Sequence, residues 1–205
     1  MSYPFYIIFN MAFLNFLKEN RSFFQYEITS WFGGKYNIAP QFIHPEILRA
    51  YNLQPFHTYT EAFSGMFWSG LLLPHEHMPL LKKRVYNDLN DLNANLFLCI
   101  KHYEPFLAFL RNLGFENNRN VFDEFKSRIF DPRFRARLDP EYPDFEAAYM
   151  YLYVMSNAYN GMVRETTSFN RNIIHNGRFK ALMNKLDNPV WKSRIERITD
   201  IGSRN

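Results

Sequence analysis

Residues 57–73 read HTYTEAFSGMFWSGLLL, and this segment gives the first indication of the fold class. Residues 57–63 have the β-branched and aromatic composition of a short strand, Ser64 and Gly65 form a turn, and the apolar run 66–73 predicts a helix. Residues 82–88 predict a second strand, and apolar residues recur at helical spacing after it as far as Ile100. Two strand-helix units in succession indicate a parallel sheet in an α/β fold.

The chain changes character after about residue 112. Further helices are predicted at residues 36–42 (ending near Pro45), 121–130, 144–159 and 178–186. The third of these is apolar on almost every side, which indicates a buried helix, and Asn160-Gly161 is a sequence at which helices commonly end. The Arg-, Asp- and Pro-rich residues 131–143 predict a loop.

A β-hairpin arm could begin at Thr166, Thr167 and Phe169, with its turn at Asn176-Gly177. We therefore expect an α/β domain made of residues 1–111 and 177–205, interrupted by a mainly helical insert of residues 112–176 that bears this hairpin. A chain of 205 residues is long enough to bury a core without disulfides or metals.

The aromatic content of 19% is high, and large rings serve either as core volume or as stacking surfaces for flat ligands. The formal charge of +4 is unevenly distributed, because the last 44 residues hold nine basic and four acidic side chains. Such a segment is either a nucleic-acid-binding surface or an ordinary solvated face. Cys99 is the one cysteine, so no internal disulfide is expected.

Residues 1–17 are apolar but have no positive residue before the apolar run, and Pro4, Asn10 and Asn15 interrupt it. The run is too short to span a bilayer, which needs about 20 mostly apolar residues. We expect a buried segment, no membrane partner and a cytoplasmic protein of bacterial or phage type, with translation starting at Met1 or Met11.

Gly65 stands at the turn between the first strand and its helix, where glycine allows a ligand to approach the backbone. Asp88 closes the second strand, where a carboxylate of a doubly wound sheet accepts hydrogen bonds from ribose hydroxyls. Both residues also have common structural roles, since a turn uses glycine and Asp88 or Asn90 could cap the next helix.

Four motifs follow one another along the chain: Trp31-Phe32-Gly33-Gly34-Lys35, Glu61-Ala62-Phe63-Ser64-Gly65, Asn87-Asp88-Leu89-Asn90 and Tyr159-Asn160-Gly161-Met162-Val163-Arg164. Their order and spacing resemble the Dam-like N6-adenine DNA methyltransferases over about residues 28 to 175. The resemblance implies a Rossmann-like S-adenosylmethionine-dependent methyltransferase sheet with a DNA-recognition insert, as used in restriction-modification.

The resemblance implies a cofactor site made of Trp31, Gly33, Gly34, Lys35, Phe63, Gly65 and Asp88. Lys35 could meet the methionine carboxylate of S-adenosylmethionine, or it could be a surface lysine after a glycine turn. Trp31 could instead be a core residue.

The resemblance also implies a DNA-binding set of Asn160, Met162 and Arg164. An arginine can donate two parallel hydrogen bonds to O6 and N7 of guanine. Met162 would act as a wedge between bases, because an adenine must leave the duplex before its amino group can be methylated. An exposed Met and Arg after a helix is the alternative.

Two departures from the family pattern stand out. Phe67 replaces the second glycine of the cofactor turn, so we expect weakened binding or a different course of the loop, with Gly70 too late to substitute. The Asp-Pro-Pro-Tyr motif that holds the target amino group is absent. No catalytic residue is therefore assigned.

Three other short patterns carry no function in this interpretation. They are Asp139-Pro140-Glu141-Tyr142, Asn188-Pro189-Val190-Trp191 and His75-Glu76-His77. The first lies before the recognition segment, the second does not follow a buried strand, and both lack the second proline. The third has too few ligands for zinc, so no metal site is predicted.

The sequence thus predicts a site-specific DNA adenine methyltransferase in truncated form, with S-adenosylmethionine as cofactor and double-stranded DNA as partner. A second polypeptide would supply the missing catalytic half. A non-catalytic DNA-binding remnant and a structural helical domain remain as alternatives.

Overall fold

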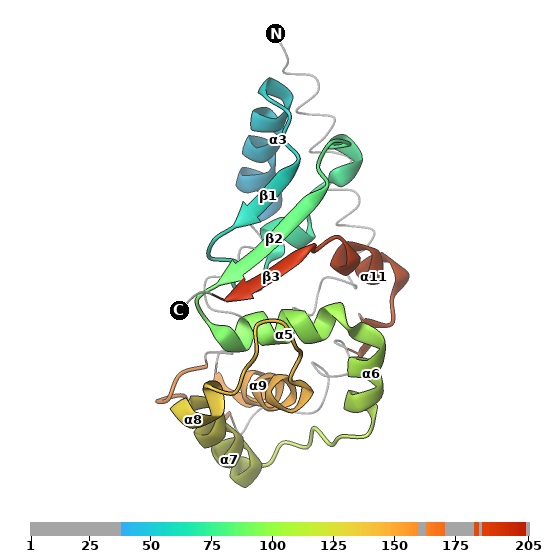
Figure 1. The fold of residues 1–205 in the computed structure, drawn as a ribbon. Coiled ribbons are helices and arrows are strands. Elements are labelled where there is room, and N and C mark those ends of the chain that lie inside the picture. Colours follow the sequence, from blue (N-terminus) through green and yellow to red (C-terminus); the bar gives the residue numbers. More distant parts are fainter. Residues whose placement is uncertain (1–37, 160–162, 171–182, 185, 204–205) are drawn as a thin grey trace.

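The computed structural model describes residues 38–159, 163–170, 183–184 and 186–203. Three short parallel strands, β1 (Thr58–Glu61), β2 (Lys83–Asp88) and β3 (Asp200–Ser203), form one sheet in the order β1-β2-β3 (Figure 1). All three arrowheads in Figure 1 point to the same side, so the carboxyl ends of the strands share one edge of the sheet. The predicted mixed α/β class with a parallel sheet is confirmed, and the first two strands lie where the sequence places them.

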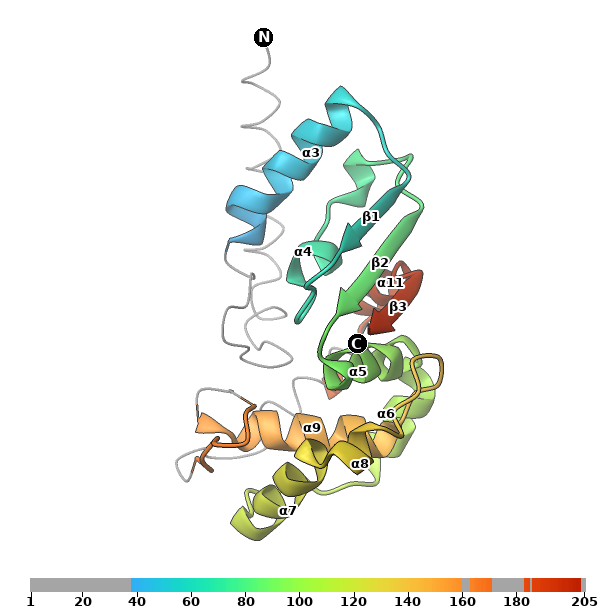
Figure 2. The same cartoon turned by 60° about the vertical axis from the view of Figure 1, so that its left-hand side comes forward.

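Two helices, α3 (His44–Leu53) and α4 (Trp68–Leu71), lie on one side of the sheet (Figure 2). A π-helical turn, Ala39–Ile43, leads directly into α3. The prediction that a helix ends near Pro45 was wrong, because this proline stands in the first turn of α3. Backbone N–H groups of the first turn have no acceptor within the helix, so a proline there costs no helical hydrogen bond. A 3₁₀ turn, His75–His77, lies between α4 and β2.

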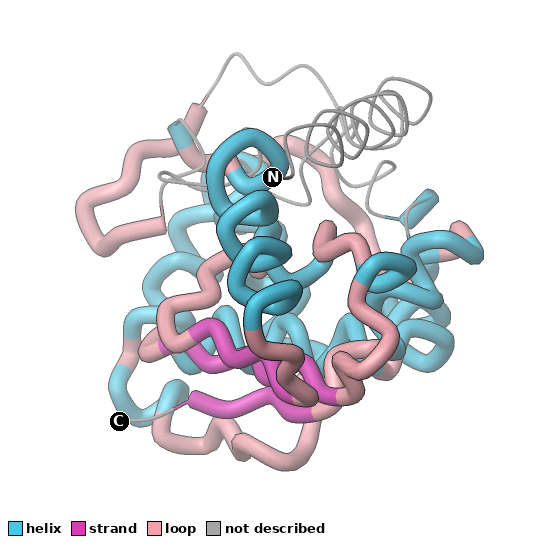
Figure 3. Tube along the Cα trace, turned by 90° about the horizontal axis from the view of Figure 1, so that it is seen from above, coloured by secondary structure: helices cyan, strands magenta, loops and turns pink. Residues whose placement is uncertain are grey.

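Helix α5 (Asp91–Lys101) packs against β2 and β3, and α11 (Pro189–Glu196) packs against α5. A short break at His102 separates α5 from α6 (Tyr103–Arg111). Seen from above, the strands run side by side and loops connect them to the surrounding helices (Figure 3). The helix α5 therefore joins the sheet to the helical part of the molecule.

The helical part contains α7 (Arg119–Phe130), α8 (Pro132–Arg135) and α9 (Phe145–Asn157). Helix α9 packs between α5 and α7, and most of its side chains are buried, which confirms the expectation of a buried helix there. The prediction of a continuous loop over residues 131–143 was wrong at its start. Asp131 accepts a hydrogen bond from the backbone of Arg133 at 2.8 Å, and the proline between them begins α8.

The chain turns back after α9. Ala158 and Phe169 form a single antiparallel bridge, and Tyr159 N–H donates to the carbonyl of Ser168 at 3.1 Å. This bridge pairs Phe169 with the residue after α9 and not across a later turn, so the expected β-hairpin stays a prediction. The turn expected at Asn176-Gly177 and most of the helix expected at residues 178–186 lie outside the described residues. The boundaries of an insert at residues 112 and 176 remain a prediction.

Candidate functional site at the carboxyl edge of the sheet

The turns that follow β1 and β2 are held together by Asp88. Its Oδ2 accepts a hydrogen bond from the backbone N–H of Gly65 at 2.7 Å, across 23 residues of sequence. Its Oδ1 accepts from the backbone of Asn90 at 2.9 Å and from Nδ2 of Asn93 at 3.4 Å. The structure thus brings together two residues that the sequence analysis selected separately. A carboxylate has about four acceptor positions, so capacity for a further donor remains.

The turn after β1 is fixed by a second set of bonds. Ser64 donates its hydroxyl to the carbonyl of Glu61 at 2.7 Å and accepts from the backbone of Asn87 at 3.0 Å. The hydroxyl of Tyr86 donates to the carbonyl of Gly65 at 2.8 Å, and burial raises the pKa of this phenol well above its usual value. Gly65 has φ 52°, a left-handed conformation that favours glycine.

Phe67, the residue that departs from the family pattern, also has a left-handed backbone, with φ 54°. Its ring is fully buried and makes an edge contact with Tyr86 at a centroid distance of 5.4 Å. A Cβ added to Gly70 would meet the Phe67 ring at 2.2 Å, so the absent side chain of Gly70 leaves the room that the ring occupies. The backbone therefore turns as a glycine would. Gly70 thus provides space for the ring in the core, whereas the expectation that it comes too late to replace the second glycine of the cofactor turn stays a prediction.

Two large apolar side chains on the turns after β1 and β2 are exposed. Phe63, in the first turn, is 80% exposed, and Leu89, in the second, is 69% exposed. Both follow carboxyl ends of parallel strands, where ligands of doubly wound sheets bind. An exposed ring and an exposed aliphatic chain beside a carboxylate suit the flat base and the ribose of a nucleoside.

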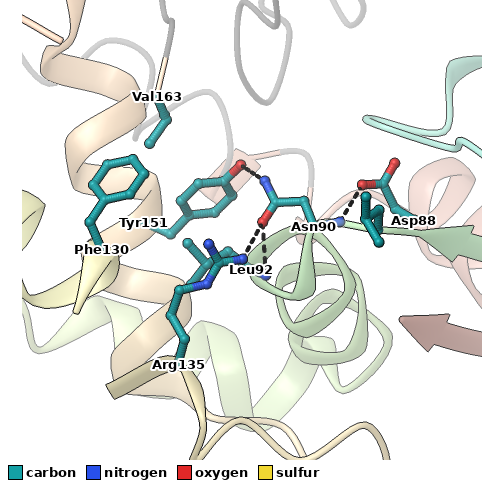
Figure 4. A pocket seen from close by; sticks show the side chains of 8 residues that line it. Asp88, Asn90, Leu92, Phe130, Arg135, Tyr151 and Val163 are labelled. Carbon is teal, nitrogen blue, oxygen red and sulfur yellow. Dashed lines mark hydrogen bonds between the residues drawn. The ribbon is translucent and has the colours of Figure 1, made fainter. Parts of the chain in front are cut away.

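A cavity of about 370 Å³ begins at Asp88 (Figure 4). Small-molecule sites typically have volumes of roughly 300–1,000 Å³, so this cavity is large enough for one. The side chains that line it are Asp88, Leu89, Asn90, Leu92, Phe130, Arg135, Tyr151 and Val163. Four of these side chains are apolar and four carry polar groups, so the cavity is more polar than most small-molecule sites.

Sequence reasoning missed three polar residues around this cavity: Asn93, Tyr151 and Arg135. Tyr151 donates its hydroxyl to Oδ1 of Asn93 at 2.7 Å, and burial raises the pKa of this phenol, so the hydroxyl stays a donor. Arg135 donates to the side chains of Asn90 and Asp91. A sequence signal existed for Asn93, because an asparagine inside an otherwise apolar helix must find a partner when it is buried.

A second polar cluster lies beneath α4. Ser69 donates its hydroxyl to Oε1 of Glu61 at 2.8 Å, and the carbonyl of Ser69 lies 2.8 Å from Nε2 of His44. All three residues are buried. Burial and the nearby Arg194 and Arg84 lower the pKa of His44 to about 4, opposed by the bond to Ser69. This cluster anchors α4 to the end of β1.

Arg164, of the three predicted DNA-binding residues, lies within the described residues and is exposed. Its backbone N–H donates to the hydroxyl of Thr167 at 2.8 Å, and its carbonyl accepts from the backbone of Thr167 at 2.9 Å. These bonds form a tight turn. Lys126 of α7 donates to the carbonyl of Thr167 at 3.0 Å and so ties the turn to the helical part.

Several predicted site residues cannot be placed. Trp31, Gly33, Gly34, Lys35, Asn160 and Met162 lie outside the described residues. The structure therefore brings together Gly65 and Asp88, with Phe63 on the first of the two turns.

Some of the basic side chains among the last 44 residues make contacts within the protein. Arg194 is only 9% exposed and donates to the carbonyl of Leu71 at 2.7 Å, so it supports the end of α4. Arg84, which lies outside this segment, is also buried and donates to the carbonyl of Gly70 at 3.4 Å. Lys192 lies 3.8 Å from Asp187. Residues such as Arg194 are therefore excluded from a nucleic-acid surface.

Within the described ranges, no group of three or more His, Cys, Asp or Glu side chains could hold a metal ion. No helix in the same ranges is both long enough and apolar enough to cross a membrane.

A scan against protein-family models, a search of curated proteins and a search of solved structures each found no match to this chain. The likeness to the adenine methyltransferases therefore rests on the four sequence motifs.

Proposed function

We propose that this chain binds S-adenosylmethionine at the carboxyl ends of β1 and β2 and belongs to an enzyme that methylates N6 of adenine in DNA. The observation that carries the proposal is the hydrogen bond between Gly65 and Asp88, because it joins the two turns between which a nucleoside would lie. Phe63 and Leu89, which stand on the two turns that this bond joins, have exposed side chains.

The residues present fit the cofactor. Asp88 keeps acceptor capacity for ribose hydroxyls, and Leu89 offers an apolar surface to the adenine ring. When bound, S-adenosylmethionine supplies an activated methyl group. The chain's own contribution is to bind and orient it, and the transfer step is assigned to no residue of this sequence, which has no Asp-Pro-Pro-Tyr motif.

Titration calorimetry with S-adenosylhomocysteine, the unreactive product of methyl transfer, tests the proposal. We expect the wild type to bind it, and Asp88→Ala to bind at least about tenfold more weakly, because hydrogen bonds to a charged group are lost. Leu89→Ser provides a second variant that should fold normally, since this side chain is 69% exposed. The control is Asp139→Ala, at an exposed residue outside the cavity. Absence of binding by the wild type would refute the proposal.

A second candidate is a DNA-binding protein without cofactor. It is favoured by the exposed position of Arg164 on a turn that Lys126 ties to α7. Specific DNA binding by a wild-type protein that does not bind S-adenosylhomocysteine would support this candidate against the first.

A further inference from the structure

The cavity beside Asp88 has walls from two parts of the molecule. The end of β2, the turn after it and the start of α5 contribute Asp88, Leu89, Asn90 and Leu92. The helical part contributes Phe130, Arg135 and Tyr151, and the segment after α9 contributes Val163. Figure 4 shows the two groups facing each other, with Asn90 between Tyr151 and Arg135. The helical part is thus a component of the cavity as well as a neighbour of the sheet.

Arg135 of α8 makes the polar connection between the two parts. Its Nε donates to Oδ2 of Asp91 at 3.1 Å, and its Nη2 donates to Oδ1 of the same carboxylate. Nη2 also lies 3.3 Å from Oδ1 of Asn90. The side chains of Arg135 and Asp91 are 32% and 22% exposed, so water screens this pair less than it screens a surface pair. A planar guanidinium that donates two hydrogen bonds to one carboxylate fixes the orientation of the two groups as well as the distance between them.

Asn90 links Arg135 to the residues that surround Asp88. Its Oδ1 caps α5 by accepting from the backbone of Leu92 at 3.2 Å, and its Nδ2 donates to the hydroxyl of Tyr151 at 3.4 Å. Tyr151 then bonds Asn93, and Asn93 bonds Asp88. A continuous chain of hydrogen bonds therefore runs from α8 to the carboxylate that holds the two turns together.

Neighbouring arginines serve a different purpose. Arg137 pairs with Asp144 at 3.3 Å and with Glu146 at 3.2 Å, and Arg128 also pairs with Glu146. These pairs join α7 and the residues after α8 to the start of α9. Of these three arginines, Arg135 is the one that lines the cavity.

We propose that Arg135 is a positioning residue of the nucleoside site, through which the helical part holds the turn of residues 88–90 in its ligand-binding conformation. The proposal rests on the proposed function, since Asp88 and Leu89 belong both to the proposed nucleoside site and to the lining of this cavity. It assigns to the helical part a role in binding the nucleoside.

Arg135→Gln and the matched control Arg137→Gln test the proposal. Each variant loses ion pairs, and Arg135→Gln should lower the thermal midpoint more than Arg137→Gln, because the pair of Arg135 with Asp91 is less exposed than the pairs of Arg137. Calorimetry with S-adenosylhomocysteine, at a temperature where all proteins are folded, should show about tenfold weaker binding for Arg135→Gln. Binding by Arg137→Gln should stay within about twofold of the wild type.

The affinity of the double variant Arg135→Gln/Asp91→Asn, compared with that of Arg135→Gln, tests the coupling of these two residues separately from a general loss of stability. If Arg135 acts through Asp91, the double variant should bind no more weakly than Arg135→Gln alone. Arg135→Lys should restore only part of the affinity, because an ammonium cannot grip the carboxylate at two points.

The outcomes separate the two proposals. A wild type that does not bind S-adenosylhomocysteine overturns the proposed function and this inference with it. A wild type that binds, together with Arg135→Gln binding equally well, overturns the inference alone. Equal losses in Arg135→Gln and Arg137→Gln would likewise overturn it, because both variants would then act through general stability.

Discussion

Asn95 of α5 and Asp144 exchange two hydrogen bonds. Nδ2 of Asn95 donates to the carbonyl of Asp144, and the backbone N–H of Asp144 donates to Oδ1 of Asn95, each at 2.8 Å. Asn95 is 3% exposed, and Asp144 is the N-cap of α9, where its side chain accepts from the backbone of Ala147. The side chain of Asn95 in α5 therefore holds the N-cap residue of α9, the central helix of the helical part.

Replacement of Asn95 by Ala should lower the free energy of unfolding by roughly 2–3 kcal/mol, because two bonds are lost and the backbone groups of Asp144 are left without these partners. Urea denaturation measures this change. Asn112→Ala is the control, since its side chain is exposed and bonds only the carbonyl of Ala108 among the hydrogen bonds described. Equal losses in the two variants would contradict the role given to Asn95.

Gly70→Ala should destabilise the protein by about 1–3 kcal/mol, because the new Cβ would overlap the buried ring of Phe67. The double variant Gly70→Ala/Phe67→Leu should be no less stable than Phe67→Leu alone, since a smaller side chain makes room for the methyl group. Thermal denaturation gives both comparisons.

The control for this pair is Gly114→Ala. A Cβ on Gly114 would meet nothing within 4 Å, so the change should stay within about 0.5 kcal/mol of the wild type. A Gly70→Ala variant as stable as this control would show that the ring and the glycine are not in contact in solution.

Stability should fall with acid in a window set by His44. Its pKa is lowered from 6.5 to about 4 in the folded protein, so the unfolded chain binds the extra proton between these values. The contribution of His44 to the free energy of unfolding is complete above pH 6.5 and decreases as the pH falls, with a loss of roughly 2 kcal/mol by pH 5. Urea denaturation at a series of pH values should show this slope.

His44→Gln should flatten the slope between pH 6.5 and 5, whereas His102→Gln, at an exposed residue, should leave it unchanged. A slope that persists in His44→Gln would assign the proton uptake to another group.

Arg164→Ala should reduce discrimination at one guanine of the recognised DNA site by about 1–3 kcal/mol, since a two-point contact with O6 and N7 would be lost. Competition binding with duplexes that differ at single positions measures the change. Arg133→Ala, on an exposed residue of α8, is the control. Weaker binding of Arg164→Ala to all duplexes alike would identify a phosphate contact instead.

Local patterns were sufficient to predict β1, β2, α7 and α9, because each combines a clear hydrophobic period with a recognisable end. Asn118 and Asp144 cap the two helices as such residues commonly do. Strand β3 was not predicted, since Asp200–Ser203 has only four residues, among them a glycine and an aspartate that strands disfavour. Its pairing with β2 joins residues more than 100 positions apart, as in the pair of Val85 and Asp200.

The site was predictable to the extent that it follows strand ends. Gly65 and Asp88 each lie where a parallel sheet presents its ligand-binding edge, so they could be selected from the sequence. Arg135 could not, because its role depends on how α8 meets α5, and nothing local distinguishes it from Arg133 or Arg137. Burial of Tyr151 was expected from the pattern of α9, but its bond to Asn93 depends on the packing of two helices.

The contact between Phe67 and Gly70 has a consequence for recognising such turns in other sequences. A sequence pattern that demands glycine at the third position of the turn would reject this chain, although its backbone there is left-handed as a glycine's would be. The small residue stands three positions later, as Gly70. In this chain the two positions form one packing unit, because the ring of Phe67 fills the space that a side chain at position 70 would need.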